Sequence, residues 1–157
     1  MTTAEKLVKV LIDKKLTCAT AESCTGGGVG HAITAVAGSS AVFMGGIISY
    51  DNSVKHGVLG VPEEVLETNG AVSAECAEAM AEGARWLLKT DFAVSITGIA
   101  GPGGGSVEKP VGLVWFGLAS KDGTITEKKV FSGDREAVRM LAIDYALVLL
   151  VEIAMRS

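Results

Sequence analysis

Ser23 is the residue of this sequence best placed to carry out covalent chemistry. It lies within residues 20–30, TAESCTGGGVG, between a β-prone apolar run and a helical pattern. A strand that breaks into a helix at glycines leaves unpaired backbone N–H groups, which favour an anion or a developing oxyanion. A nucleophile and its oxyanion donors can then come from one stretch. The alternative is that Ser23 or Thr25 caps the helix and the glycines only permit the turn.

Lys55 is the candidate base for such a nucleophile. It follows a predicted strand that ends at Tyr50. A lysine desolvated beside a strand end has a lowered pKa, and with Ser23 it would form a Ser–Lys pair, a variant of the Ser–His–Asp arrangement. Tyr50 would relay a proton or orient the lysine. The alternative is a solvated Lys55 and a Tyr50 that packs at the strand end.

A second glycine-rich stretch and several cations are candidates for binding an anionic ligand. Residues 97–106, TGIAGPGGGS, can hold a phosphate through backbone N–H groups, and Lys109 follows directly. Arg135 and Arg139 lie one helical turn apart near the start of the last predicted helix. The alternatives are a plain connecting loop, a solvated lysine and surface ion pairs with neighbouring acids.

Strands alternate with helices along the chain and a hairpin follows, which predicts a mixed sheet covered by helices on both faces. Three parallel strands would end near Ser23, Tyr50 and Thr97, so both glycine-rich stretches and Lys55 would meet in one cleft. The short helix before Leu59 is expected to be capped by Asn52 or Ser53. Helices are expected over residues 4–14, 30–36, 52–59, from 62, 73–89 and 135–155, and strands over 17–21, 43–50, 92–97, 111–119 and 124–131.

The composition predicts one packed globular domain over residues 1–157. The chain is 48% hydrophobic and 20% charged, with a formal net charge of −4 and no run of Lys or Arg, which argues against a nucleic-acid partner. No signal peptide is recognised and no apolar stretch is long enough to span a membrane. Three cysteines without metal-like spacing favour a reducing cytoplasm and no metal site. Cys24 is a rival nucleophile to Ser23, although a small buried side chain is the favoured interpretation.

Seven motifs stand in order along the chain. They are TAESCTGG at 20–27, GSS at 38–40, YxNxxK at 50–55, GAVS at 70–73, TGIAGP at 97–102 followed by two glycines at 104–105, KPVG at 109–112 and FSGDR at 131–135. Together they resemble the CinA C-terminal domain family, the nicotinamide-nucleotide amidohydrolases, in the stand-alone form. The resemblance implies a three-layer α/β/α sandwich with a mixed, mostly parallel five-stranded sheet containing one antiparallel strand, and a homodimer.

The resemblance also implies an activity. The family hydrolyses the carboxamide of nicotinamide mononucleotide to nicotinate mononucleotide and ammonia, in pyridine-nucleotide recycling and without a cofactor. Ser23 matches its catalytic serine, Lys55 its lysine and Tyr50 its tyrosine. The residues expected to bind the nucleotide are Thr25, Gly26, Gly27, Asn52, Thr97, Gly98, Gly101, Gly104, Lys109, Arg135 and Arg139.

The expected mechanism begins with a neutral Lys55 that takes the proton of Ser23. Ser23 then attacks the carboxamide, ammonia leaves, and water hydrolyses the acyl-enzyme, while N–H groups near residues 25–27 hold the oxyanion. Direct attack by an activated water is the alternative. Two other functions are open: a non-catalytic nucleotide-binding module with the same loops, and a competence-related interaction protein, for which the sequence offers no basic or long apolar surface.

Overall fold

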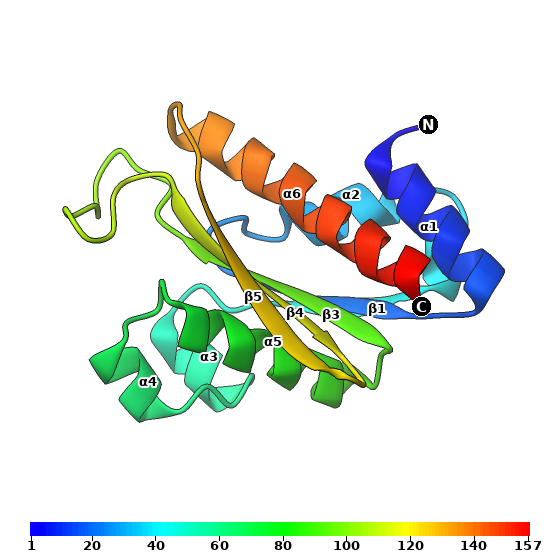
Figure 1. Cartoon of the computed structure of the whole chain (residues 1–157), viewed down its shortest axis with the longest axis horizontal. Helices are drawn as coiled ribbons and strands as arrows, with labels where there is room; N and C mark the ends of the chain where they lie inside the picture. The colour runs from blue at the N-terminus through cyan, green and yellow to red at the C-terminus, as the bar shows by residue number, and fades with distance from the viewer.

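The computed structural model describes all residues, 1–157, as a five-stranded sheet between two helical layers (Figure 1). The strand order is β2-β1-β3-β4-β5. Strands β2, β1 and β3 are parallel, whereas β4 is antiparallel to both β3 and β5. Only β4 therefore runs against the other four, and the predicted fold class is confirmed. The strands are β1 (Cys18–Glu22), β2 (Phe43–Ile48), β3 (Phe92–Gly98), β4 (Leu113–Ser120) and β5 (Gly123–Val130).

Helices lie on both sides of the sheet (Figure 1). On one face lie α1 (Thr3–Lys14), α2 (Gly28–Thr34) and α6 (Arg135–Arg156), and on the other lie α3 (Asn52–Gly57), α4 (Glu63–Thr68) and α5 (Ala74–Leu88). A short 3₁₀ turn, Ser39–Ala41, precedes β2. The predicted helices and strands are all present, with ends displaced by at most two residues. No helix is long and apolar enough to cross a membrane.

The core follows from the alternation of side chains along the two central strands. Every residue of β1 is buried, as expected for a parallel strand covered on both faces. Cys18 packs into the larger apolar cluster beneath α1 and α6, whereas Ala19 and Ala21 pack into a smaller cluster beneath α5. Because neighbouring residues point to opposite faces, Ser23 continues the α5 side and Glu22 the α2 side.

The two glycines of β2, Gly45 and Gly46, lie at a bulge and at a close approach to β1. The pairing register with β1 shifts between Cys18 and Ala19. A Cβ on Gly46 would lie 2.1 Å from Thr20 Oγ1, so a larger residue there would have to displace the Thr20 side chain.

The carboxyl ends of β1, β2 and β3 meet at one edge of the sheet. The Ser23 amide donates to the carbonyl of Ile96 at 2.9 Å, and the Ser49 amide donates to the carbonyl of Glu22 at 2.7 Å. The predicted convergence of the three strand ends is therefore confirmed. The residues that immediately follow these strands build the candidate site.

Candidate active site

Ser23 and Lys55 form a buried pair at this edge. Lys55 Nζ lies 3.0 Å from Ser23 Oγ, and it also donates to the carbonyl oxygens of Ser49 at 2.7 Å and Tyr50 at 2.9 Å. Lys55 is 1% exposed and Ser23 is 8% exposed. The alternative of a solvated Lys55 is therefore wrong, and the two residues that the sequence singled out are in hydrogen-bond contact.

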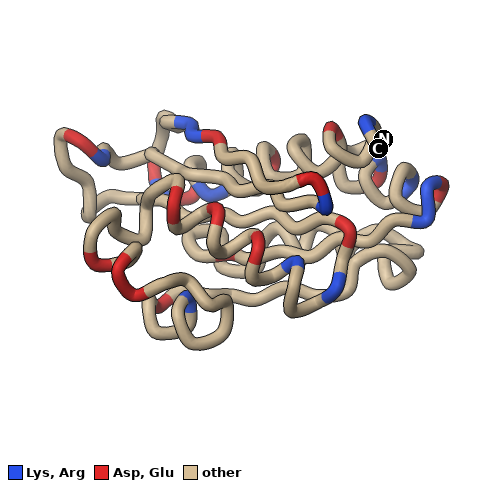
Figure 2. Tube along the Cα trace, turned by 60° about the horizontal axis from the view of Figure 1, so that its bottom comes forward, with Lys and Arg blue, Asp and Glu red and all other residues tan.

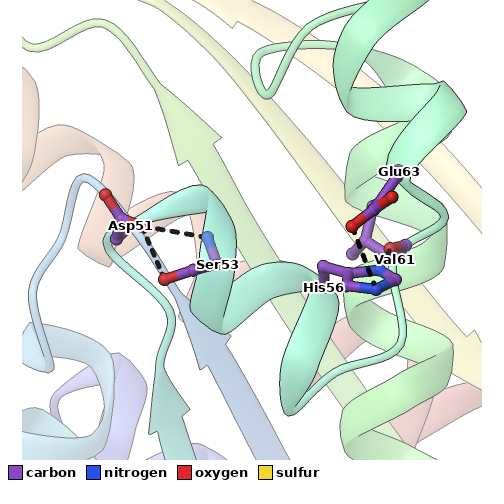
Figure 3. Close-up of polar contacts among 5 residues, drawn as sticks. All are labelled: Asp51, Ser53, His56, Val61 and Glu63. Carbon is purple, nitrogen blue, oxygen red and sulfur yellow. Dashed lines mark hydrogen bonds and ion pairs between the residues drawn. The ribbon is translucent and has the colours of Figure 1, made fainter.

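The N-terminus of α3, the helix that carries Lys55, is fixed by Asp51 (Figure 3). Asp51 is the N-cap, with an extended backbone and a carboxylate that accepts from the Ser53 amide at 3.0 Å and from Ser53 Oγ at 2.6 Å. The prediction that Asn52 or Ser53 caps this helix is wrong by one residue. Asp51 is favoured because its side chain reaches the amide two residues ahead. Asn52 is instead the exposed first residue of the helix.

The last turn of α3 is fixed by a histidine. His56 Nδ1 makes a 2.7 Å hydrogen bond with the carbonyl of Val61, and its Nε2 lies 3.5 Å from Glu63 at the start of α4 (Figure 3). With both ends of this six-residue helix held, Lys55 has little freedom to swing toward solvent. The role of His56 is therefore structural.

Burial lowers the pKa of the Lys55 ammonium from its ordinary value of 10.5. The three oxygen neighbours suit the neutral amine as well as the ammonium. A neutral amine has two N–H groups for the two carbonyls and one lone pair for the Ser23 hydroxyl proton. The arrangement can therefore move a proton from Ser23 to Lys55 without rearranging other contacts, which is what a nucleophile–base pair requires.

The amides at the start of α2 do not serve as the expected anion site. The Glu22 carboxylate accepts from the Val29 and Gly30 amides at 2.9 and 3.0 Å. A buried acid of the chain itself occupies these two amides, which lie beyond the donors predicted near residues 25–27. The unpaired donors lie earlier, in the turn: the amides of Cys24, Thr25 and Gly27 make no hydrogen bond within the chain.

The rival nucleophile Cys24 is poorly suited to the task. Burial raises the pKa of its thiol to about 11, and burial likewise raises the pKa of Cys76 to about 11. Only the thiolate is strongly nucleophilic, so neither thiol competes with Ser23 at neutral pH. The favoured interpretation of Cys24 as a small buried side chain agrees with the structure.

Tyr50 contributes its backbone to the pair and its side chain to the rim. Its carbonyl holds Lys55, while its hydroxyl lies 3.4 Å from Arg135 Nη2 and makes no hydrogen bond with Ser23 or Lys55. The side chain is 63% exposed. The backbone contact agrees with a role for Tyr50 in orienting Lys55. A proton relay through the hydroxyl would need a hydrogen bond from that hydroxyl to Ser23 or Lys55, and its only bond is with Arg135.

The two arginines of α6 reach different loops of this edge. Arg135 Nη1 donates to the carbonyl of Gly101 at 2.8 Å, so it joins the β3–β4 loop to Tyr50. Arg139 donates from Nε to the carbonyl of Cys24 at 3.0 Å and from Nη2 to that of Thr25 at 3.3 Å. Arg135 is exposed and retains free donors, whereas Arg139 is half-buried against the Ser23 turn.

Two further polar candidates, Thr97 and Lys109, are held by backbone carbonyls. Thr97 is buried, and its hydroxyl donates to the carbonyl of Ala71 at 2.9 Å. Lys109 reaches across from the β3–β4 loop and donates to the carbonyl of Asn69. The hydroxyl of Thr97 is thus engaged in joining β3 to the segment before α5, whereas the ammonium of Lys109 has further donors.

The predicted glycines have different roles. A Cβ on Gly98 would lie 2.7 Å from Val114 Cγ2, so this residue permits close packing of β3 against β4. Gly26 and Gly27 have positive φ in the Ser23 turn, and Gly101 and Gly104 have positive φ in the loop beyond β3. Gly104 is exposed at the rim. Gly26 and Gly27 therefore shape the turn that carries Ser23, and Gly101 and Gly104 shape the loop beyond β3.

Sequence reasoning missed the backbone acceptors of the site. The carbonyls of Ser49 and Asn69 orient Lys55 and Lys109, yet neither residue was a candidate. Ser49 had a usable signal, since it directly precedes Tyr50 at a strand end. Asn69 had none, because its contact with Lys109 joins residues forty positions apart.

The charge distribution favours an anion at this edge. Acidic residues are spread over the outside of α4 and α5, the layer that comes forward in Figure 2. Three cationic side chains surround the strand ends beside Lys55 instead: Lys109, Arg135 and Arg139. No cluster of His, Cys, Asp or Glu that could hold a metal ion is present. A small anionic ligand is therefore attracted to the site and repelled by the helical surface beside it.

The fold and the buried Ser–Lys pair define an α/β/α protein with a candidate hydrolytic centre at the ends of its parallel strands. The model of the CinA C-terminal domain family matches residues 1–154, and the chain belongs to this family.

Two solved structures share the fold. A CinA superfamily protein from Klebsiella pneumoniae aligns with a TM-score of 0.94 and 34% identity over 99% of this chain and 97% of that one. A competence/damage inducible protein from Agrobacterium tumefaciens aligns with a TM-score of 0.90 and 41% identity over 98% and 96% of the two chains.

Curated relatives carry two kinds of name. A nicotinamide-nucleotide amidohydrolase, PncC, of Enterobacter agglomerans is 56% identical over 133 residues, which cover 84% of this chain and 80% of that protein. A CinA-like protein of Leptospira borgpetersenii is 50% identical over 154 residues, or 98% of this chain. The chain spans only 37% of the length of that second relative.

Proposed function

We propose that this protein is a nicotinamide-nucleotide amidohydrolase with Ser23 as nucleophile and Lys55 as base. The observation that carries the proposal is the 3.0 Å contact between Lys55 Nζ and Ser23 Oγ in a buried position. The relative named for this activity, at 56% identity, supports the choice of substrate. The cations around the strand ends support a substrate that carries a phosphate.

In the proposed reaction, neutral Lys55 takes the Ser23 proton as Oγ bonds to the carboxamide carbon. The carbonyl oxygen becomes an oxyanion, for which the unpaired amides of Cys24 and Thr25 are the nearest backbone donors in sequence to Ser23. The C–N bond then breaks, and the Lys55 ammonium returns the proton to the departing nitrogen, giving ammonia. Water attacks the acyl-enzyme with Lys55 again as base, which releases nicotinate mononucleotide and restores the Ser23 hydroxyl.

Ammonia release from nicotinamide mononucleotide by the purified protein tests the proposal. Free nicotinamide and other nucleotides serve as comparison substrates. Binding of the nucleotide without ammonia release would support the non-catalytic module and contradict the proposed activity. The homodimer and the cytoplasmic location expected from the sequence stay predictions.

The activity is expected to rise with pH. Because the base must be neutral, kcat should increase as Lys55 loses its proton, with a midpoint below 10.5, the direction in which burial shifts its pKa. A kcat–pH profile of the wild type measures this midpoint. Activity that falls as pH rises from neutrality would contradict a lysine base.

Arg135 is expected to recognise the phosphate. Its guanidinium is exposed and keeps donors free beyond the bond to Gly101. Arg135→Ala should raise KM for nicotinamide mononucleotide by about tenfold, the loss of one charge-assisted contact, with a small change in kcat. The matched substrate is nicotinamide riboside, which lacks the phosphate and should show no such change. An equal KM increase for both substrates would assign Arg135 to loop structure instead.

A further inference from the structure

Glu22 is a buried acid that the proposed reaction does not use. It is 2% exposed, and its carboxylate accepts three hydrogen bonds: from Thr25 Oγ1 at 2.6 Å and from the amides of Val29 and Gly30 at 2.9 and 3.0 Å. It lies on the opposite face of β1 from Ser23. Glu22 therefore cannot act as the base for Ser23, and its contacts all lead to the turn and helix that follow the nucleophile.

The backbone of the Ser23 turn has an asymmetric hydrogen-bond pattern. The carbonyl of Ser23 accepts from the Gly26 amide, and the carbonyls of Cys24 and Thr25 accept from Arg139. The amides of Cys24 and Thr25 have no partner within the chain. Every carbonyl of these three residues is engaged, while two adjacent donors next to the nucleophile are left available. Such donors stabilise an oxyanion only if they are fixed beforehand.

We propose that Glu22, acting through the Thr25 hydroxyl and together with Arg139, is a positioning residue that fixes the Cys24 and Thr25 amides as oxyanion donors. The inference rests on the proposed function, since it assigns donors to the same reaction. Glu22 anchors the turn from within, and Arg139 holds its carbonyls from α6. The Glu22 carboxylate accepts three hydrogen bonds at its two oxygens. A glutamine at this position has one acceptor oxygen, and its NH₂ group would face donors instead of accepting from them.

Matched substitutions of Thr25 test this role. Thr25→Val keeps the shape but removes the hydroxyl that bonds Glu22, and Thr25→Ser keeps the hydroxyl. Thr25→Val and Glu22→Gln should each lower kcat about 10- to 100-fold through misplaced oxyanion donors, with KM and the pH midpoint of Lys55 unchanged. Thr25→Ser should recover most of kcat. A merely structural role would lower the melting temperature without this split between kcat and KM.

A substrate-independent readout separates this inference from the proposed function. A fluorophosphonate probe reacts with Ser23: Oγ bonds to phosphorus, fluoride leaves, and the serine proton passes to Lys55. Negative charge develops on the phosphoryl oxygen, so the labelling rate also depends on the oxyanion donors. Slower labelling of folded Thr25→Val than of the wild type, measured by mass at Ser23, supports the inference. It does so even if the wild type releases no ammonia from nicotinamide mononucleotide. Absence of ammonia release would contradict the proposed function alone.

Other outcomes would overturn the inference. Equal labelling and equal kcat in Thr25→Val and the wild type would overturn it. If the Glu22 and Thr25 variants do not fold, Arg139→Met carries the test, because the half-buried Arg139 holds the same turn from outside. Unchanged labelling in folded Arg139→Met would likewise overturn the inference. A wild type that is neither labelled nor releases ammonia would overturn both proposals.

Discussion

Ser23→Ala and Lys55→Ala are each expected to lower kcat for deamidation by about a thousandfold or more. Ser23→Ala removes the nucleophile, and Lys55→Ala removes the group 3.0 Å away that accepts its proton. Because the two side chains act as one unit, the double variant should be little worse than either single variant. Initial rates of ammonia release, with circular dichroism to check folding, measure the effect.

Two substitutions sharpen this test. Lys55→Arg keeps a positive charge that does not titrate, so it should be as inactive as Lys55→Ala if the lysine is a base. Lys9→Ala makes the same chemical change as Lys55→Ala at an exposed ion pair with Asp13 and should leave kcat unchanged. Near-normal turnover by Lys55→Ala would reduce Lys55 to a binding residue. Glu22 could not replace it, since it lies on the other face of β1.

A milder change is expected at Tyr50, and it follows from the same geometry. Tyr50→Phe leaves the carbonyl that holds Lys55 and removes only a hydroxyl that contacts Arg135. Its kcat should therefore fall much less than that of the Lys55 variants. A loss as large as that of Lys55→Ala would show that the hydroxyl takes part in proton transfer.

The fold was predictable because local patterns and one topological rule agree. Buried-type runs such as residues 92–96 are typical of central strands, and alternation with helices favours parallel neighbouring strands. Once the strands are parallel, their carboxyl ends share an edge. The rule brought Ser23 and Lys55 together although 32 positions separate them in sequence.

The details of the site were not predictable to the same degree, because they depend on contacts between distant segments. Spacing indicates that Thr97 ends a strand, but not that the carbonyl of Ala71 lies within reach of its hydroxyl. Spacing likewise indicates free amides after Ser23, but not that Glu22 turns back to take two of them. Side-chain direction at a turn is set by packing from other elements, which a single-sequence pattern does not record.

The close packing of α5 on the sheet depends on a glycine in the middle of β4. The Gly117 amide donates to Ser95 Oγ at 3.0 Å, and Ser95 Oγ donates to the carbonyl of Ala77 in α5 at 2.6 Å. A Cβ on Gly117 would lie 2.3 Å from the Ala77 carbonyl oxygen and 2.6 Å from Ser95 Oγ. A methyl group therefore has no space unless the helix moves away from the sheet.

Gly117→Ala is accordingly expected to lower the free energy of unfolding by about 3 kcal/mol, because overpacking against backbone is not relieved by a rotamer change. Urea unfolding measures the change. Gly103→Ala is the matched control: its Cβ would meet nothing within 4 Å, so its effect should stay within about 0.5 kcal/mol. Equal stability of Gly117→Ala and the wild type would mean that α5 shifts at little cost. The Ser95 bridge would then not hold the helix to the sheet.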